Sequence, residues 1–213
     1  MYPPAVPQRP LVLASASPRR AELLRSAGVE FTVHAVDCDE RWLPGERAVH
    51  YAVRVATAKA LAAAEQLRGR DLASPPPLIL AADTTVWFGA EQEPLQKPVD
   101  RAHATAMLRQ LTGGEPHRVT TACAFARPDH DPPLLAEFAV TTVVRMRTLD
   151  ERQFAAFIGP YLDAGDWTDK AGGYAIQGRA AGLVEAIDGS YTSVVGLPLA
   201  EVLTELDAFE GLP

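Results

Sequence analysis

The segment LVLASASPRRAELLRSAG, residues 11–28, predicts a short buried strand that leads directly into a helix. Its first three residues, Leu11 to Leu13, form an apolar run typical of a buried strand. Pro18 suits the first position of a helix, where its missing N–H would have no partner, and Ser17 is a favourable N-cap. Gly28 is expected to end the helix. The chain is therefore expected to open with a strand–turn–helix unit.

Two arginines, Arg19 and Arg20, fall in the first turn of this helix, where the helix dipole disfavours cations. Free N–H groups, the hydroxyls of Ser15 and Ser17 and two guanidinium groups would converge on one point. Such a set of groups suits an anion, most simply a phosphate. The alternative is a solvated helix start with two surface arginines.

The composition is that of a soluble globular protein, with 213 residues of which 47% are hydrophobic and 22% charged. This length favours one domain, although two small ones also fit. The net charge of -7 argues against non-specific binding to nucleic acid or to an anionic membrane surface. No stretch approaches the roughly 20 apolar residues of a membrane span.

The expected cellular setting is the cytoplasm. The two cysteines, Cys38 and Cys123, have no metal-type spacing and fit a reduced, intracellular protein. The first ten residues, MYPPAVPQRP, contain four prolines and lack the apolar segment of a signal peptide. We therefore expect residues 1–10 to form a mobile tail and residues 11–213 to form a single domain.

Hydrophobic periodicity and turn residues predict a chain in which strands and helices are interspersed. Strands are expected at residues 31–36, 78–82, 86–88, 119–126, 136–146, 183–187 and 191–195, with a turn at 89–93. Helices are expected at residues 46–67, 100–111 and 198–209, and a further helix from a capping box at 148–151 to about Phe157. Antiparallel pairs in the second half of the chain predict an α/β fold with a mixed sheet.

Asp83 is the first acidic residue to consider for catalysis. It follows LILAA, which is typical of a buried strand, and sites in open α/β sheets gather at the carboxyl ends of strands. A carboxylate there is costly unless it binds a cation or hydrogen-bond donors. The alternative is an aspartate that caps a turn through Thr85.

A second acidic group, Asp37, Asp39 and Glu40, places three carboxylates within four residues. Such oxygen ligands suit a hard divalent cation such as Mg²⁺, although an acidic run by itself is more often a solvated loop. Two lysines also have distinctive neighbours. Lys59 lies in an alanine-rich helix, where it can snorkel to solvent, and Lys97 precedes a proline that restricts its backbone.

The tract DKAGGYAIQG, residues 169–178, combines groups that suit a flat ligand. Its glycines permit close approach of the backbone, Tyr174 can lie against a ring, and the Gln177 amide can both donate and accept hydrogen bonds. A tight irregular loop is the equal alternative. The five histidines have no zinc-binding spacing, and the chain has no phosphate-loop motif, no dinucleotide fingerprint and no nucleophile elbow.

Taken together, these motifs resemble those of the Maf family of nucleoside triphosphate pyrophosphatases. LASASPRRAELL resembles the N-terminal signature of the family, and AADTTV its second motif. TAK and QKP place Lys59 and Lys97 on two family lysines, while DKAGGYAIQG and SYTSVVGLPL resemble the C-terminal motifs. The resemblance covers about residues 11–209. It implies a Maf/ITPase-like domain, with a twisted mixed sheet, flanking helices and a deep nucleotide-binding cleft.

The resemblance implies hydrolysis of a nucleoside triphosphate to the monophosphate and pyrophosphate, and it implies roles for eleven residues. Asp83, Glu40, Lys59 and Lys97 would be catalytic, and Ser15, Ser17, Arg19, Arg20, Thr84, Lys170 and Gln177 would bind the substrate. Glu40 and Asp83 would hold a divalent cation, Mg²⁺ or Mn²⁺, while Asp83 would also accept the proton of the attacking water. A homodimer is implied as well.

Three residues resemble the subgroup of the family that hydrolyses dTTP and UTP: Arg19, Thr84 and Gln177. These residues would face the base or the sugar. Two positions depart from the family pattern, since Asp39 stands where Glu is common and Gln96 where Gly is common. Two other functions remain open: a nucleotide-binding regulator of cell division that does not cleave, and a phosphoryl-transfer enzyme that releases orthophosphate.

Overall fold

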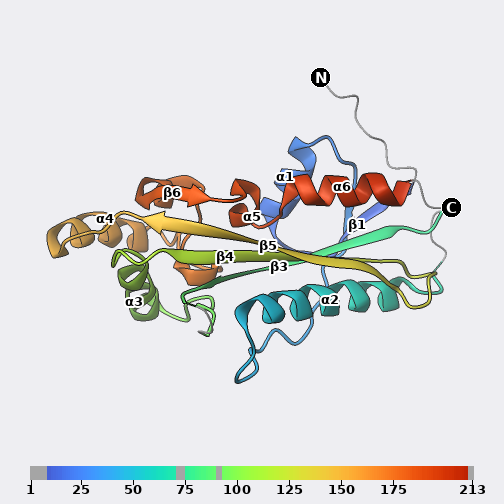
Figure 1. The fold of residues 1–213 in the computed structure, drawn as a ribbon, viewed down its shortest axis with the longest axis horizontal. Helices are drawn as coiled ribbons and strands as arrows, with labels where there is room; N and C mark the ends of the chain where they lie inside the picture. The colour runs from blue at the N-terminus through green and yellow to red at the C-terminus, as the bar shows by residue number, and fades with distance from the viewer. Residues whose placement is uncertain (1–8, 71–74, 90–92, 211–213) are drawn as a thin grey trace.

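The computed structural model describes residues 9–70, 75–89 and 93–210. These residues contain one six-stranded sheet with the strand order β2-β1-β3-β4-β5-β6 (Figure 1). The strands are β1 (Leu11–Leu13), β2 (Thr32–Val33), β3 (Leu78–Trp87), β4 (His117–Ala126), β5 (Leu134–Met146) and β6 (Val184–Asp188). β1 pairs in parallel with β2 and β3, and the pairs from β3 to β6 are antiparallel. The prediction of an α/β fold with a mixed sheet is confirmed.

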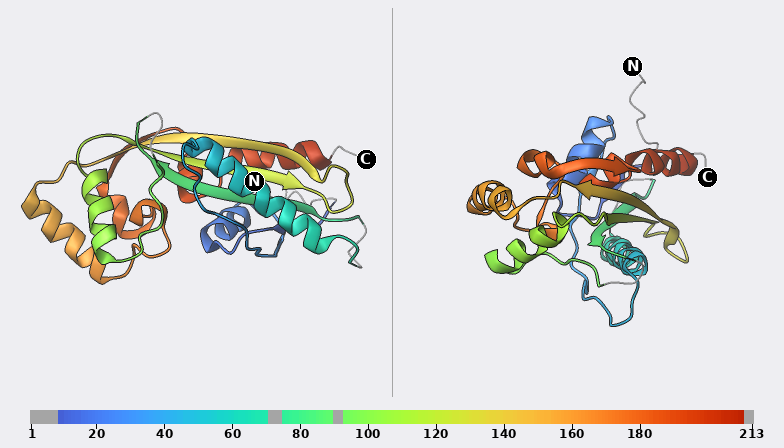
Figure 2. Two further views of the ribbon diagram at one scale, coloured as in Figure 1. Left: turned by 90° about the horizontal axis from the view of Figure 1, so that it is seen from below. Right: turned by 60° about the vertical axis from the view of Figure 1, so that its left-hand side comes forward.

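Helices cover both faces of the sheet (Figures 1 and 2). One face carries α1 (Pro18–Ser26), α5 (Tyr191–Val195) and α6 (Leu199–Glu210), and the other carries α2 (Ala48–Leu67). At one end of the sheet lie α3 (Arg101–Leu111), α4 (Glu151–Asp163) and the 3₁₀ helices η1 (Ala171–Gly173) and η2 (Gly178–Leu183). The arrangement leaves the central strands buried on two sides.

The first half of β3 explains how one strand serves two cores. Successive strand residues face opposite sides of a sheet. Leu78 and Leu80 accordingly pack with α1 and α6, whereas Ile79 and Ala81 pack against α2. The face of α2 toward the sheet is mostly alanine, with Ala52, Ala56, Ala60 and Ala63 all fully buried. Small side chains let this helix lie close to the strands.

Two expected strands are wrong. The strand predicted at 31–36 shrinks to Thr32–Val33, because only these two residues find register partners on β1 and both are exposed. The strand predicted at 191–195 is the helix α5. Its N-cap is Ser190, whose hydroxyl accepts a hydrogen bond from the Ser193 N–H. This cap outweighs the strand preference of a β-branched run.

Two other boundaries differ from the prediction. The strands expected at 78–82 and 86–88 are one continuous strand, β3, so Asp83 lies inside a strand rather than after it. The helix expected at 148–157 is α4, which begins later and continues to Asp163. Its capping box uses Asp150 as N-cap and Gln153 as the third helical residue, because the carboxylate of Asp150 receives the Gln153 N–H at 2.7 Å.

Some expectations fall outside the described residues. These are positions 1–8 of the predicted tail and positions 90–92 of the predicted turn. Pro10, which is predicted to lie in the tail, accepts a hydrogen bond from the Leu78 N–H through its carbonyl oxygen.

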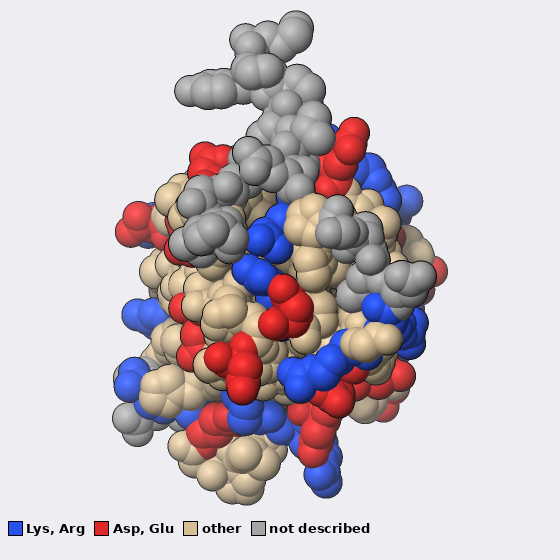
Figure 3. Space-filling view, turned by 90° about the vertical axis from the view of Figure 1, so that its right-hand side faces the viewer, with Lys and Arg blue, Asp and Glu red and all other residues tan. Residues whose placement is uncertain are grey.

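None of the helices in the described part of the chain combines the length and the hydrophobicity that crossing a membrane requires. On the face shown in Figure 3, basic and acidic side chains are interspersed.

Candidate active site

The pocket lies along the part of β3 that extends beyond its pairing with β1. β1 pairs with β3 only from Leu78 to Leu80, yet β3 continues to Trp87. Among the described residues, the next partner on that edge is Leu95, which forms an isolated bridge with Val86. A cavity of about 740 Å³ opens along this part of β3, lined by Asp83, Thr84 and Thr85 among others.

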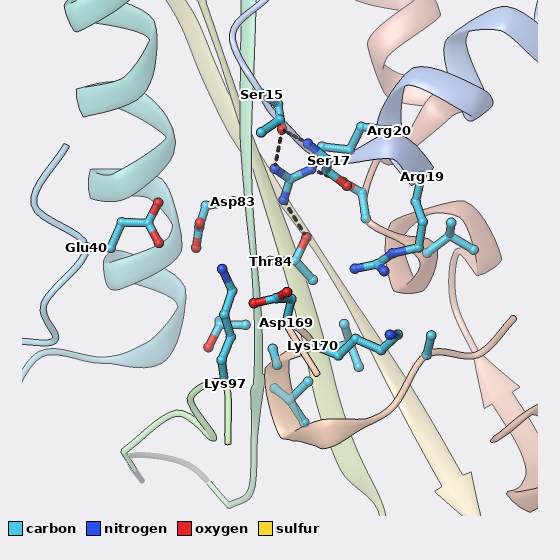
Figure 4. Close-up of a pocket in the computed structure, with 18 of the residues that line it drawn as sticks. Ser15, Ser17, Arg19, Arg20, Glu40, Asp83, Thr84, Lys97, Asp169 and Lys170 are labelled. Atoms are coloured by element: carbon cyan, nitrogen blue, oxygen red, sulfur yellow. Dashed lines mark hydrogen bonds between the residues drawn. The ribbon is translucent and has the colours of Figure 1, made fainter. Parts of the chain in front are cut away.

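Asp83 and Glu40 meet at one ammonium group. The Lys59 Nζ atom, which projects from α2, lies 2.9 Å from Asp83 Oδ1 and 2.8 Å from Glu40 Oε1. The side chains of Lys59 and Asp83 are each only 10% exposed, whereas that of Glu40 is 45% exposed. Figure 4 shows the two carboxylates next to each other on one side of the pocket. The ammonium group of Lys59 therefore forms ion pairs with two carboxylates, and the one on Asp83 is deeply buried.

The environment shifts the two acids in opposite directions. Burial raises the pKa of Asp83, and the charges of Lys59 and Arg20 oppose this rise without cancelling it. Burial also acts to raise the pKa of Glu40, but the hydrogen bond and charge of Lys59, with the charge of Lys97, bring it below its ordinary value. Acids whose pKa values are pushed apart can take different parts in one reaction.

Arg20 is buried on the opposite wall and joins three segments of the chain. Its Nε donates to the Gly196 carbonyl oxygen at 2.8 Å, Nη1 to Ser15 Oγ at 3.0 Å, and Nη2 to Thr84 Oγ1 at 3.1 Å. Ser15 Oγ also accepts the Ser17 N–H at 3.2 Å. Because that oxygen accepts two hydrogen bonds, its own O–H is left to donate to a ligand.

The predicted cap at the start of α1 is only partly right. Ser17 is the N-cap residue and Pro18 follows at the first helical position. The Ser17 side chain, however, makes no capping hydrogen bond. The backbone N–H groups of this first turn are therefore available to an anion, as the local pattern suggested.

The remaining expected site residues line the same cavity. These are Arg19, Lys97, Lys170 and Gln177. Lys97 extends toward the two acids from below in Figure 4, and Arg19 extends from α1. Lys170 donates to the Thr168 carbonyl oxygen at 3.2 Å, and its pKa is lowered by burial and by the charge of Arg19. The structure thus brings all eleven predicted site residues to one pocket.

The acidic loop contributes less than its sequence suggested. Asp37 and Glu40 line the pocket, but Asp39 is exposed and pairs with Arg41, whose guanidinium holds the pKa of Asp39 low. Among the described residues, no three His, Cys, Asp or Glu side chains lie together in a group that could hold a metal ion. Glu40 and Asp83 remain, and two carboxylates with substrate phosphates form a donor set that suits Mg²⁺. Both acids now bond Lys59, which a cation would have to displace or share.

Two further lining residues, Tyr51 and Asp169, carry polar groups that the sequence analysis did not assign to the site. Tyr51 on α2 lies two helical turns before Lys59, on the same side of the helix, and this spacing was readable in the sequence. Asp169 belongs to the DKAGGYAIQG tract and lines the pocket, and Figure 4 shows its carboxylate inside the cavity. Its φ of 57° places it in the left-handed region. No sequence pattern predicted that conformation.

The sequence matches the Maf-like protein family over residues 10–209. The chain belongs to the Maf family. It is 48% identical to a dTTP/UTP pyrophosphatase of Geobacter sulfurreducens, over 92% of this chain and 94% of the relative. It is 42% identical to a dTTP/UTP pyrophosphatase of Hahella chejuensis, over 95% and 93% respectively. The resemblance seen in the motifs is therefore confirmed.

A solved structure of a HAM1 protein from Coxiella burnetii covers 94% of this Maf chain and 100% of its own. Its TM-score is 0.49 and its sequence identity is 15%. The assignment to the Maf family rests on the sequence match.

Proposed function

We propose that this protein hydrolyses dTTP and UTP to the nucleoside monophosphate and pyrophosphate. The observation that carries the proposal is one pocket in which a buried carboxylate, Asp83, lies among cationic side chains. The cations are Arg19, Arg20, Lys59, Lys97 and Lys170. They offset the charge of a triphosphate, which otherwise repels a nucleophile. The names of the relatives support the same reaction.

In the proposed reaction, water attacks the α-phosphorus. A bond forms between the water oxygen and that phosphorus, and the bond to the oxygen bridging the α- and β-phosphorus breaks. Asp83 accepts the proton released by the water, a role favoured by a pKa that burial raises. Lys59, Lys97 and Arg20 stabilise the negative charge of the departing pyrophosphate.

Glu40 and Asp83 are the residues we assign to a divalent cation, Mg²⁺ or Mn²⁺. When bound, the cation neutralises phosphate charge and polarises the phosphoryl group. Because one oxygen of Asp83 cannot both bind a cation and accept a proton, its two oxygens would divide these tasks. Ser15 and Ser17, just before α1, would hold phosphate oxygens through their hydroxyls, beside the uncapped backbone N–H groups of the first turn of the helix.

Arg19, Thr84 and Gln177 are the residues we assign to the base and sugar. Gln177 can donate and accept hydrogen bonds at a pyrimidine edge. Replacing it in Gln177→Ala should change the ratio of rates for dTTP and CTP more than it changes the best rate. If the ratio stays the same, Gln177 has no part in base recognition.

The direct test is product analysis. Purified protein with Mg²⁺ is incubated with dTTP, UTP and CTP, and both pyrophosphate and orthophosphate are measured. Pyrophosphate release supports the proposal, orthophosphate indicates a different phosphoryl-transfer enzyme, and binding without cleavage indicates a regulator of the kind the sequence left open. Asp83→Asn should abolish turnover, and turnover near that of the wild type would refute its role as base.

Other parts of the assignment extend this proposal. We expect the protein to act in the cytoplasm, to work as a homodimer, and to bind neither nucleic acid nor membranes. Residues 11–213 would form its single domain. Sedimentation analysis of the purified protein would test the dimer directly.

A further inference from the structure

The segment that carries Glu40 has no regular structure of its own. Residues 34–47 connect β2 to α2 and contain neither helix nor strand. Their backbone therefore lacks the repeated hydrogen bonds that hold a strand in place. The position of Glu40 must come from other contacts, since its side chain is 45% exposed and packing alone constrains it weakly.

Two side chains of α2 reach the backbone of this segment beside Glu40. The Tyr51 hydroxyl donates to the Glu40 carbonyl oxygen at 2.8 Å, and Arg54 Nη2 donates to the Arg41 carbonyl oxygen at 2.9 Å. Tyr51 is 5% exposed, and burial raises its pKa to about 12. The phenol therefore keeps its proton at neutral pH and remains a donor.

Arg54 is itself held by Glu46, at the far end of the same segment. The guanidinium binds both carboxylate oxygens, with Nε 2.6 Å from Oε1 and Nη2 2.8 Å from Oε2. The Glu46 side chain is only 11% exposed. Its Oε2 also accepts the Leu43 N–H at 3.3 Å, and the Trp42 indole donates to the Glu46 carbonyl oxygen at 3.0 Å. The segment is thus fastened both to α2 and to itself.

We propose that Tyr51 and the Arg54–Glu46 pair are positioning residues for the Glu40 carboxylate and thereby set the affinity of the site for its divalent cation. The inference rests on the proposed function. It follows from how Glu40 is held: Tyr51 fixes its backbone, and Lys59, two turns along the same helix, fixes its carboxylate.

The backbone contact matters most when the cation binds. A cation at Glu40 competes with Lys59 for the carboxylate, so the contact to Lys59 weakens at the moment when Glu40 must be in place. The contacts from Tyr51 and Arg54 involve carbonyl oxygens and are unaffected by that competition. They supply the preorganisation on which tight cation binding depends.

Tyr51→Phe and Glu46→Gln test the proposal together. Tyr51→Phe removes only a hydroxyl from a residue that lines the pocket. Glu46→Gln weakens the ion pair with Arg54, and Glu46 does not line the pocket. Each should raise the Mg²⁺ concentration for half-maximal activity about fivefold, the effect of losing one hydrogen bond. At saturating Mg²⁺, kcat and the KM for dTTP should stay within about twofold of the wild type, since neither variant removes a group that binds the phosphates.

A second readout avoids turnover. Mn²⁺ binding is followed by electron paramagnetic resonance in the presence of a dTTP analogue with a methylene group between the α- and β-phosphorus. Both variants should bind Mn²⁺ about fivefold more weakly, as expected from one lost hydrogen bond. The matched control is Thr112→Val, which removes a hydrogen bond of 2.8 Å from a buried hydroxyl to the Leu108 carbonyl oxygen. It should leave Mn²⁺ affinity unchanged.

The outcomes separate the two proposals. If the wild-type protein releases no pyrophosphate from dTTP, the proposed function fails. If the wild type is an active cation-dependent pyrophosphatase but both variants bind Mn²⁺ as it does, only the positioning inference fails. It also fails if Thr112→Val weakens Mn²⁺ binding as much as Tyr51→Phe, because general destabilisation would then explain the effect. Thermal unfolding of each variant verifies that it is folded.

Discussion

Replacing Lys59 by methionine should destabilise the free protein in a way that depends on pH. The substitution keeps an unbranched side chain on α2 but removes the ammonium group from Asp83 and Glu40. Glu40 is 45% exposed and can be solvated, whereas the Asp83 side chain is 10% exposed. Removing one partner of a buried ion pair typically costs about 3–5 kcal/mol, because it leaves an uncompensated charge.

Protonation limits this cost. The unpaired Asp83 can bind a proton instead of remaining charged, starting from an ordinary pKa of 3.8. Keeping Asp83 protonated costs about 1.4 kcal/mol for each pH unit above this pKa, which amounts to about 4 kcal/mol at pH 7. The folded variant then binds a proton that the unfolded chain does not, so its stability falls as pH rises above the unfolded pKa. The deficit should be about 3–4 kcal/mol at pH 7 and below about 2 kcal/mol at pH 5.

The assay is urea unfolding followed by tryptophan fluorescence, with EDTA present, between pH 5 and pH 8. A double variant, Lys59→Met with Asp83→Asn, should recover at least about 2 kcal/mol relative to Lys59→Met, because the amide carries no charge to leave unpaired. Activity should not recover with stability, since both groups belong to the proposed catalytic set. Arg101→Met, which breaks an ion pair whose side chains are 53% and 71% exposed, is the matched control and should change little at any pH.

Two results would refute this reasoning. A stability deficit of Lys59→Met that is the same at pH 5 and pH 7 would show that Asp83 is not an unpaired buried acid in the variant. Additive effects in the double variant would show that Lys59 and Asp83 do not stabilise each other, despite the 2.9 Å between them.

Further predictions concern the packing around the pocket. The His117 ring is fully buried, and burial lowers its pKa to about 3, against 6.5 in the unfolded chain. Between these two pKa values the unfolded chain binds more protons than the folded one. The free energy of unfolding should therefore fall by about 1.4 kcal/mol per pH unit from about pH 6 toward pH 3. Unfolding curves of His117→Gln should lose that part of the acid dependence, and an unchanged slope would exclude His117 as its source. Gly172→Ala should destabilise by more than about 1 kcal/mol, because φ is +68° and the new Cβ would lie 3.3 Å from Val86 Cγ1. Thermal unfolding of Gly172→Ala checks this sign, and a variant as stable as the wild type would contradict it.

Local patterns in the sequence predicted most elements correctly. The apolar run at β1, the proline that opens α1 and the periodicity of α2 report short-range preferences, which act wherever the chain folds. The exceptions arose where a cap or a missing neighbour outweighed those preferences. Ser190 converted a β-branched run into α5, and β2 remained short because only two residues pair with β1.

The expected site residues line one pocket, but the structural reason for its position differs in part from the one that the sequence suggests. The sequence predicts Asp83 to follow a strand, at the carboxyl end of a sheet, whereas in the structure it lies within β3. The pocket exists because β1 ends at Leu13 while β3 continues past Asp83, leaving an open edge. Where a neighbouring strand ends depends on how distant segments pair, and that information is not contained in the residues around Asp83.

The sequence by itself determined which chemical groups this protein carries and which family it belongs to, since motifs such as SPRR and DKAGGYAIQG are local strings of side chains. Only the tertiary structure decided how those groups are held: Lys59 between two acids, Arg20 bonded to three segments, and Glu40 fastened through Tyr51. The physical reason is that a hydrogen bond or ion pair between residues far apart in the chain forms only when the whole core has packed. Arg20 and Gly196, 176 positions apart, illustrate it most clearly.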